Sequence, residues 1–351
     1  MKFYPLKVKD IRKETTDCVS VSFEVPETLA NIFTFIQGQY LTFKINLEGE
    51  DIRRSYSICT APEDQDLRVA IKQVEEGKFS TFANQQLKVN DIVEVMPPMG
   101  NFYTTINAAN EKNYVFFAAG SGITPIISII KTVLKNEPKS SCTLLYGNQK
   151  VSTIIFKEDI ESLKNMYLGR LQLFHILSRE HNESELFNGR LEKEKIALIL
   201  EKIPPLLEAH EFFACGPEEM IMAMKDILSE KGISEDHIHF ELFNAPKQKV
   251  KKEVIQQAVE SHATIKLDGL TLYIPVEKGQ NILEAAQLFG TDVPYACKGG
   301  VCCTCRAKLI EGEVNMMVNY ALTKTELENG FILTCQAIPK SKNVIIDFDI
   351  K

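Results

Sequence analysis

The sequence of 351 residues is 44% apolar and 25% charged, the composition of an ordinary globular protein, and its length suggests two or three domains. Its formal net charge of −7 gives no support to a nucleic-acid partner, which would favour a basic face. The N-terminal residues MKFYPLKVKDIRKE are too charged for a secretory signal.

The first hundred residues read as short strands separated by turn signals. Alternating apolar positions and β-branched residues dominate these strands, which is the pattern of a small antiparallel barrel. The predicted strands are CVSVSFEVP at 18–26, QYLTFKIN at 39–46, RRSYSICTA at 53–61, LRVAIKQV at 67–74 and DIVEVMPP at 91–98.

One of these strands carries a motif with the chemistry of a flavin site. The segment RRSYS contains R-x-Y-S, in which Arg54, Tyr56 and Ser57 flank Ser55. An aromatic ring can stack on an isoalloxazine, a hydroxyl can approach flavin N5, and an arginine can neutralise a pyrophosphate. Taken alone, the segment is better explained as an ordinary amphipathic strand.

A helix start follows at GKFSTFANQQL, residues 77–87. Gly77 and Ser80 lie where backbone N–H groups and the helix dipole favour a phosphate. Ser80 is equally explained as a simple N-cap.

From about Asn113 compact apolar runs alternate with helical patterns. Such runs are typical of strands buried on both faces, with crossover helices between them, so we predict a doubly wound α/β domain. The run–helix pairs are 114–120 with 124–136, 142–148 with 156–167, 171–178 with 191–203, and 212–216 with 217–232.

The stretch VFFAAGSGITPIISIIKTVL, residues 115–134, is long enough to cross a bilayer. Gly120, Gly122, Pro125 and Lys131 instead favour a strand, a turn and a helix. We therefore expect no membrane partner. Four scattered cysteines in apolar surroundings indicate a reducing compartment, so we expect a soluble, cytoplasmic protein.

Two turns in this region are candidate nucleotide contacts. In AAGSGITP, Gly120 and Gly122 allow close approach of the backbone to a ligand, and Thr124 and Pro125 open the following helix. Pro125 takes the place of the last glycine in the usual dinucleotide fingerprint.

The second turn is ACGP, residues 214–217, which ends a later strand at Cys215 and continues through Gly216 and Pro217. A lone cysteine there is often a small core residue. At the carboxyl end of a strand in this fold, however, it lies at the ligand crevice.

A polar, charged segment at residues 245–261 is a candidate linker. The remainder reads as two strands (ATIKLDGLTLYIPV, 263–276), a helix (NILEAAQLFG, 281–290), the cysteine-rich segment YACKGGVCCTC and further strands.

The cysteine spacing is the most specific signal in the chain. Cys297, Cys302 and Cys305 form C-x4-C-x2-C, and Cys335 follows at a distance, which is the spacing of plant-type [2Fe–2S] ligation. Gly299 and Gly300 supply the backbone freedom for a close wrap. A structural zinc site would favour two C-x2–4-C knuckles or histidine partners, and only one such pair is present.

Cys303 breaks this spacing, so we predict that it is not a ligand.

Taken together, these motifs resemble two known families. The last ninety residues or so resemble plant-type ferredoxin domains, which implies a β-grasp fold. Residues 1–243 resemble the ferredoxin–NADP reductase superfamily through R-x-Y-S, G-x-G-x-T-P and C-G-P. This resemblance implies FAD in the barrel, with Ser57 and Cys215 as candidate catalytic residues and Glu241 and Phe243 near the flavin.

The implied organisation has four segments. They are an FAD-binding barrel at 1–108, an NAD(P)-binding α/β domain at 109–244, the linker at 245–261, and a [2Fe–2S] domain at 262–351.

The segment LSRE, residues 177–180, is similar to the serine–arginine pair that holds the 2′-phosphate in NADP-using members of this superfamily. Because NAD sites favour an acidic residue on the ribose, Ser178 and Arg179 predict NADPH over NADH. A surface polar pair at a strand end is the alternative.

The three cofactors in this order predict electron flow from NADPH to FAD to the cluster and on to a separate protein. End to end, the chain resembles the reductase components of phenylacetyl-CoA epoxidases, which implies delivery to a di-iron oxygenase in a multicomponent complex. A reductase for another ring-hydroxylating dioxygenase or monooxygenase stays open, as does a redox-responsive [2Fe–2S] binding protein.

Overall fold

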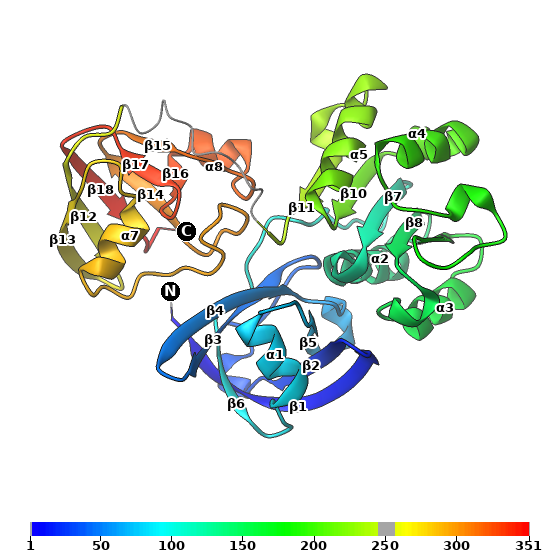
Figure 1. Cartoon of the computed structure of the whole chain (residues 1–351), viewed down its shortest axis with the longest axis horizontal. Helices are drawn as coiled ribbons and strands as arrows, with labels where there is room; N and C mark the ends of the chain where they lie inside the picture. The colour runs from blue at the N-terminus through cyan, green and yellow to red at the C-terminus, as the bar shows by residue number, and fades with distance from the viewer. Residues whose placement is uncertain (1, 245–256, 351) are drawn as a thin grey trace.

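The computed structural model describes residues 2–244 and 257–350. Figure 1 shows three lobes, each built on its own sheet and each formed by a continuous part of the chain. Most of the linker predicted at 245–261 lies outside the described residues. Ser261, at its end, is the first residue of a strand.

The N-terminal lobe is a six-stranded antiparallel sheet with one helix, α1 (Lys78–Gln85). The strand order is β4-β3-β6-β1-β2-β5, and a bridge between Ile58 and Val69 brings the two edge strands together, as the predicted barrel requires. Its core contains Phe43 and Phe79. The strands are β1 (Tyr4–Thr15), β2 (Cys18–Glu24), β3 (Tyr40–Leu47), β4 (Glu50–Ser57), β5 (Leu67–Lys72) and β6 (Ile92–Val95).

The second lobe is a parallel five-stranded sheet in the order β11-β10-β7-β8-β9. Helices α2 and α3 pack in one hydrophobic cluster and α4 and α5 in another, so both faces of the sheet are covered. The strands are β7 (Asn113–Ala119), β8 (Ser141–Asn148), β9 (Leu171–Leu177), β10 (Glu211–Cys215) and β11 (Ile238–Glu241). The helices are α2 (Ile123–Asn136), α3 (Lys157–Met166), α4 (Lys193–Lys202) and α5 (Glu218–Glu230).

The apolar stretch at 115–134 forms β7, a short turn and α2, as predicted. Within residues 2–244 and 257–350, the helices all lack the length or apolar character needed to cross a bilayer.

The third lobe is a mixed five-stranded sheet in the order β13-β12-β18-β14-β16, with α7 packed on it, which is the predicted β-grasp. Strands β12 and β18 are parallel and the other neighbours are antiparallel. The bounds are β12 (Ser261–Leu267), β13 (Leu270–Val276), α7 (Ile282–Leu288), β14 (Arg306–Glu311), β15 (Val314–Met316), α8 (Lys324–Glu328), β16 (Phe331–Leu333), β17 (Ala337–Pro339) and β18 (Asn343–Asp347).

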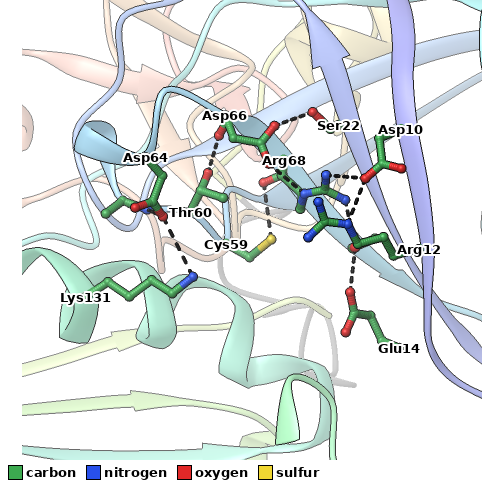
Figure 2. Close-up of polar contacts among 12 residues, drawn as sticks. Asp10, Arg12, Glu14, Ser22, Cys59, Thr60, Asp64, Asp66, Arg68 and Lys131 are labelled. Atoms are coloured by element: carbon green, nitrogen blue, oxygen red, sulfur yellow. Dashed lines mark hydrogen bonds and ion pairs between the residues drawn. The ribbon is translucent and has the colours of Figure 1, made fainter. Parts of the chain in front are cut away.

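Helix α2 joins the first two lobes. The Ser128 hydroxyl donates to the Thr60 carbonyl at 2.6 Å. Lys131 Nζ lies 3.7 Å from the Asp64 carboxylate, an ion pair that can be followed in Figure 2. A buried hydrogen bond and an ion pair therefore fix the α/β lobe to the loop between β4 and β5.

Beside this junction, Arg68 of β5 is buried inside the barrel lobe (Figure 2). Its guanidinium pairs with Asp10 at 2.6 Å and with Asp66 at 2.8 Å, and it also donates to the Ser20 hydroxyl. A buried charge is costly unless it is paired, so these partners are what allows Arg68 to be buried in the folded barrel.

Candidate functional site

A cavity of about 510 Å³ opens between the barrel lobe and the β-grasp lobe. Residues from distant parts of the chain line it. They include Tyr40 of β3, four residues of β4 (Arg53, Arg54, Ser55 and Ser57), the segment 241–244 at the end of β11, and Cys297 and Cys302 of the segment 295–305, which we call the cysteine loop. Three residues of the predicted R-x-Y-S motif and two of the predicted cluster ligands therefore face the same space, which we call the flavin-type cavity.

The R-x-Y-S residues are distributed unequally around this cavity. Arg54 is exposed and lines it, whereas the Tyr56 ring packs against Phe79, with the ring centroids 5.4 Å apart. Tyr56 is absent from the lining of both cavities in the described structure. The flavin-stacking role predicted for Tyr56 stays a prediction.

The Ser57 hydroxyl donates to the Glu241 carboxylate at 2.9 Å, which joins the end of β4 to the end of β11. Burial raises the pKa of Glu241 to about 7. Cys215 pairs with Glu241 in the register of β10 and β11 and is fully buried. Burial, followed by the Glu241 charge, holds the pKa of this thiol well above its ordinary value, so Cys215 is a neutral thiol.

Gly77 and Ser80 lie at the start of α1 but line neither cavity. Gly77 is the N-cap residue, so the alternative in which Ser80 caps the helix is wrong. The Ser80 hydroxyl instead closes the turn, because it accepts from the Val74 N–H at 3.2 Å and donates to the Gly77 carbonyl at 3.0 Å. The predicted phosphate contact stays a prediction.

A second cavity, of about 540 Å³, opens at the carboxyl ends of β7, β8 and β10, and we call it the nucleotide-type cavity. In this strand order the chain reverses direction at β7, and such switch points are where α/β sheets bind ligands. The predicted residues Gly120, Gly122, Ser178, Gly216, Pro217 and Phe243 all line it.

Gly122 shows why this turn needs glycine. A side-chain carbon there would come within 2.0 Å of the Cys215 carbonyl oxygen, so the two turns pack backbone to backbone. Thr124 and Pro125 are buried in the first turn of α2, and the Thr124 hydroxyl donates to the Ser121 carbonyl. They shape the turn and do not line the cavity.

Around the nucleotide-type cavity the structure adds residues that the sequence reasoning missed. Arg179 is exposed and is not part of the lining, whereas Arg190 is. Asn148, at the end of β8, also lines the cavity, and its buried Nδ2 has no hydrogen-bond partner in the described structure. Its place at the end of a strand, in YGN, was the signal available in the sequence.

Leu242, Phe243 and Asn244 line both cavities. One short segment after β11 therefore separates the space at the α/β switch point from the space beside β4. The order in space is nucleotide-type cavity, shared segment, flavin-type cavity and cysteine loop.

The four spaced cysteines form two pairs. The Cys302 thiol donates to Cys297 Sγ at 3.1 Å, which lowers the pKa of Cys297 and raises that of Cys302. A hydrogen bond between Cys305 and Cys335 raises the pKa of Cys305 and lowers that of Cys335. In residues 2–244 and 257–350, no group of three or more His, Cys, Asp or Glu side chains is placed to hold a single metal ion.

Two thiol pairs fit a binuclear cluster, in which four cysteines hold two irons. Backbone geometry supports the fit. Gly300 has φ of +74°, and a side-chain carbon there would lie 2.9 Å from Val318, so only glycine allows the loop its tight path. The Gly299 N–H donates to Cys297 Sγ at 3.3 Å, the kind of contact that tunes a cluster.

Cys303 is oriented differently. Its thiol donates to the Ala321 carbonyl at 3.2 Å, and its backbone N–H donates to the Tyr40 hydroxyl at 2.9 Å. This placement supports the prediction that Cys303 is not a ligand.

Three family models match successive parts of the chain. An oxidoreductase FAD-binding domain matches residues 5–103, an oxidoreductase NAD-binding domain matches 116–226, and a 2Fe-2S iron-sulfur cluster binding domain matches 265–340. Their order is that of the three lobes.

Two curated relatives align along essentially the whole chain. One of the subunits of 1,2-phenylacetyl-CoA epoxidase from Escherichia coli K12 is 39% identical over 350 residues, which cover 99% of this chain and 98% of that protein. The ferredoxin reductase component of 3-ketosteroid-9-alpha-monooxygenase from Rhodococcus rhodochrous is 30% identical over 98% of this chain and 96% of its own.

The solved structure of phthalate dioxygenase reductase has the same fold, with a TM-score of 0.59, 20% identity, and coverage of 99% of this chain and 98% of that one.

Proposed function

Because this chain belongs to the same family as that 1,2-phenylacetyl-CoA epoxidase component, we propose that it passes electrons from NADPH, through FAD and one [2Fe–2S] cluster, to a separate oxygenase. FAD bound there would supply the chemistry that links a two-electron donor to a one-electron acceptor. The observation that carries the proposal is that Leu242, Phe243 and Asn244 line both cavities, while Cys297 and Cys302 also line the flavin-type cavity.

The residues of the flavin-type cavity have distinct proposed roles. Arg54 is the cation that neutralises the pyrophosphate. The Ser57 hydroxyl, held by Glu241, presents a donor or acceptor at the reacting edge of the ring system. Cys215, a neutral thiol, and the Phe243 segment exclude water between the two cavities.

The proposed nucleotide is NADPH. Ser178 lines the nucleotide-type cavity, and Arg190 brings a cation to the same lining, so the pair offers a hydroxyl and a guanidinium for a 2′-phosphate. Arg179 adds a further positive charge at the exposed rim. NADH, which lacks that phosphate, gains nothing from these groups.

The proposed cluster ligands are Cys297, Cys302, Cys305 and Cys335. The first three lie on the cysteine loop, and Cys335 lies in the turn between β16 and β17. The nine cysteines are all free, which suits a reducing compartment, and we assign the protein to the cytoplasm.

The proposed acceptor is the di-iron oxygenase component that epoxidises phenylacetyl-CoA. The test mixes the FAD- and iron-loaded protein with that purified oxygenase, NADPH, oxygen and phenylacetyl-CoA. We expect NADPH consumption coupled to epoxide formation. NADPH consumption that is independent of phenylacetyl-CoA would contradict the proposed partner.

A second candidate is a reductase for another oxygenase, because the chain is also 30% identical to the 3-ketosteroid-9-alpha-monooxygenase reductase component. In the same assay, coupled turnover with a ring-hydroxylating or steroid oxygenase but not with the epoxidase would favour it. Loaded protein that fails to reduce artificial acceptors such as cytochrome c would instead favour a redox-responsive binding protein.

A further inference from the structure

The flavin motif contains a second arginine, Arg53, that the proposed function does not use. Its side chain is only 3% exposed. Within its own strand it pairs with Asp51 at 2.8 Å. Burial opposes its charge, but its hydrogen bonds to Asp51 and Asp292 outweigh burial and raise the pKa of Arg53.

The other contacts of Arg53 cross to the β-grasp lobe. The guanidinium makes an ion pair with Asp292, donates to the Val293 carbonyl at 3.4 Å, and stacks on the Tyr295 ring with 4.3 Å to the ring centroid. Lys44 of β3 adds a weaker contact with Asp292 at 3.9 Å. These partners lie immediately before Cys297 in the chain.

Arg68 provides an internal comparison. It and Arg53 are the buried arginines of the described residues, and both have a guanidinium paired with two carboxylates. The partners of Arg68 all belong to its own barrel, whereas Arg53 uses one side of its guanidinium to contact another lobe. A guanidinium suits this use because its planar fork binds a carboxylate and stacks on an aromatic ring at once.

The position of Arg53 gives the contact a consequence. Arg53 and its partner Tyr295 both line the flavin-type cavity, and Tyr295 lies two residues before Cys297, a proposed cluster ligand. A bond between these two segments therefore sets the separation between the flavin-type cavity and the cysteine loop.

We propose that Arg53 is a positioning residue that clamps the [2Fe–2S] lobe to the FAD-binding barrel through Asp292, Val293 and Tyr295. The clamp holds the cysteine loop where it receives electrons from the flavin. Asp292 is 62% exposed, so salt reaches this ion pair and weakens it, and the lobe can be released. The expected effect on cluster reduction rests on the proposed function. The expected effect on the radius of gyration rests only on the contacts between the two lobes.

The test uses the full chain loaded with FAD and cluster. The main variant is Asp292→Asn, because Asp292 is an exposed residue that lines neither cavity. Glu313→Gln is the matched control, since Glu313 is an exposed carboxylate on the same lobe that pairs only within it, with Lys340. Arg53→Met and the double variant complete a double-mutant cycle.

We expect Asp292→Asn to leave flavin reduction by NADPH unchanged and to slow the following cluster reduction by about tenfold or more, since the buried Arg53 guanidinium then loses its charged partner on the other lobe. Small-angle X-ray scattering should show a larger radius of gyration, and the electron paramagnetic resonance spectrum of the reduced cluster should not change. Rising salt concentration should slow cluster reduction in the native protein and in Glu313→Gln towards the rate of Asp292→Asn. Cluster reduction in the double variant, which carries both Arg53→Met and Asp292→Asn, should be no slower than in Arg53→Met alone.

An unchanged radius of gyration in Asp292→Asn overturns the clamp, as do strictly additive effects of the two substitutions. If the native protein itself fails to pass electrons from flavin to cluster, the proposed function falls. The scattering comparison still decides the clamp in that case.

Discussion

The Tyr40 hydroxyl of β3 accepts a hydrogen bond from the Cys303 backbone N–H at 2.9 Å, across the boundary between the barrel and the cysteine loop. The Tyr40 hydroxyl also lies 3.4 Å from the Thr304 hydroxyl, which in turn lies 3.2 Å from that of Thr42. A buried polar ladder therefore anchors the cysteine loop to the barrel, in addition to the contacts of Arg53.

Removing this anchor should be costly. Tyr40→Phe keeps the ring but leaves the buried Cys303 N–H without its acceptor, so we expect a loss of about 1–3 kcal/mol in the free energy of unfolding. Urea unfolding of the loaded protein measures it. Tyr273→Phe is the control, because Tyr273 is 73% exposed. Equal, small effects of the two substitutions would contradict the anchor.

The raised pKa of Glu241 predicts that the stability of the protein depends on pH. This pKa rises from an ordinary value of 4.5 to about 7, so between these values the folded protein holds a proton that the unfolded chain releases. The contribution of Glu241 to the free energy of unfolding is therefore complete below pH 4.5 and falls as pH rises to about 7.

Glu241→Gln removes this titration. Relative to that variant, the native protein should lose about 1–3 kcal/mol of stability between about pH 5 and about pH 8. Urea unfolding at the two pH values gives the difference directly. A difference that is constant, or that grows in favour of the native protein as pH rises, would show that the pKa of Glu241 is not raised.

The proposed preference for NADPH makes Ser178 and Arg190 its determinants. Ser178→Ala and Arg190→Ala should each lower kcat/KM for NADPH by about 10–100-fold, because a hydrogen bond to a charged group contributes about 1.5–3 kcal/mol. Activity with NADH should hardly change. Arg179→Ala should have the smaller effect, since its side chain does not line the cavity. A native protein that prefers NADH would refute the assignment.

The position of Gly300 leaves little room for a side chain in the cysteine loop. Gly300→Ala adds a carbon 2.9 Å from Val318 at φ of +74°, and we expect a cost of about 1–3 kcal/mol from crowding together with loss of iron on purification. Gly290→Ala is the matched control, because Gly290 has φ of +81° but open space around it. Thermal unfolding and iron content compare the two, and equal losses would mean that backbone strain alone matters.

Much of the fold follows from local patterns. The strand–turn–helix at Asn113–Asn136 was predictable because glycines and Pro125 interrupt an apolar run that would otherwise suggest one long helix. The β-grasp followed from the resemblance to plant-type ferredoxin domains. In the structure its first hairpin turns at Asp268 and Gly269, which both take positive φ, as such a turn demands.

The relative placement of the lobes was not predictable. Arg53 and Arg54 are neighbours with the same chemistry in the sequence, and both line the flavin-type cavity, yet Arg53 is buried against Asp292 whereas Arg54 is exposed. That division depends on contacts between residues far apart in the chain, which no local pattern encodes. For the same reason the sharing of Leu242, Phe243 and Asn244 by two cavities appeared only in the structure.

The site predictions divide in the same way. Gly120, Gly122 and Gly216, which the sequence predicts as nucleotide contacts, all line the nucleotide-type cavity. Such turn residues can be picked out locally because close approach of the backbone favours glycine whatever surrounds it. Arg190 was missed because its place in the cavity lining depends on how the loop after β9 returns towards the sheet.

The central claim is that Cys297, Cys302, Cys305 and Cys335 hold a cluster that takes electrons from the neighbouring flavin, whereas Cys303 takes no part. The most direct measurement is anaerobic stopped-flow reduction by NADPH of the iron-loaded native protein, Cys302→Ser and Cys303→Ser. We predict flavin bleaching in all three, and a second, cluster-reduction phase in the native protein and Cys303→Ser alone. A cluster phase that survives in Cys302→Ser, or that disappears in Cys303→Ser, would contradict the account.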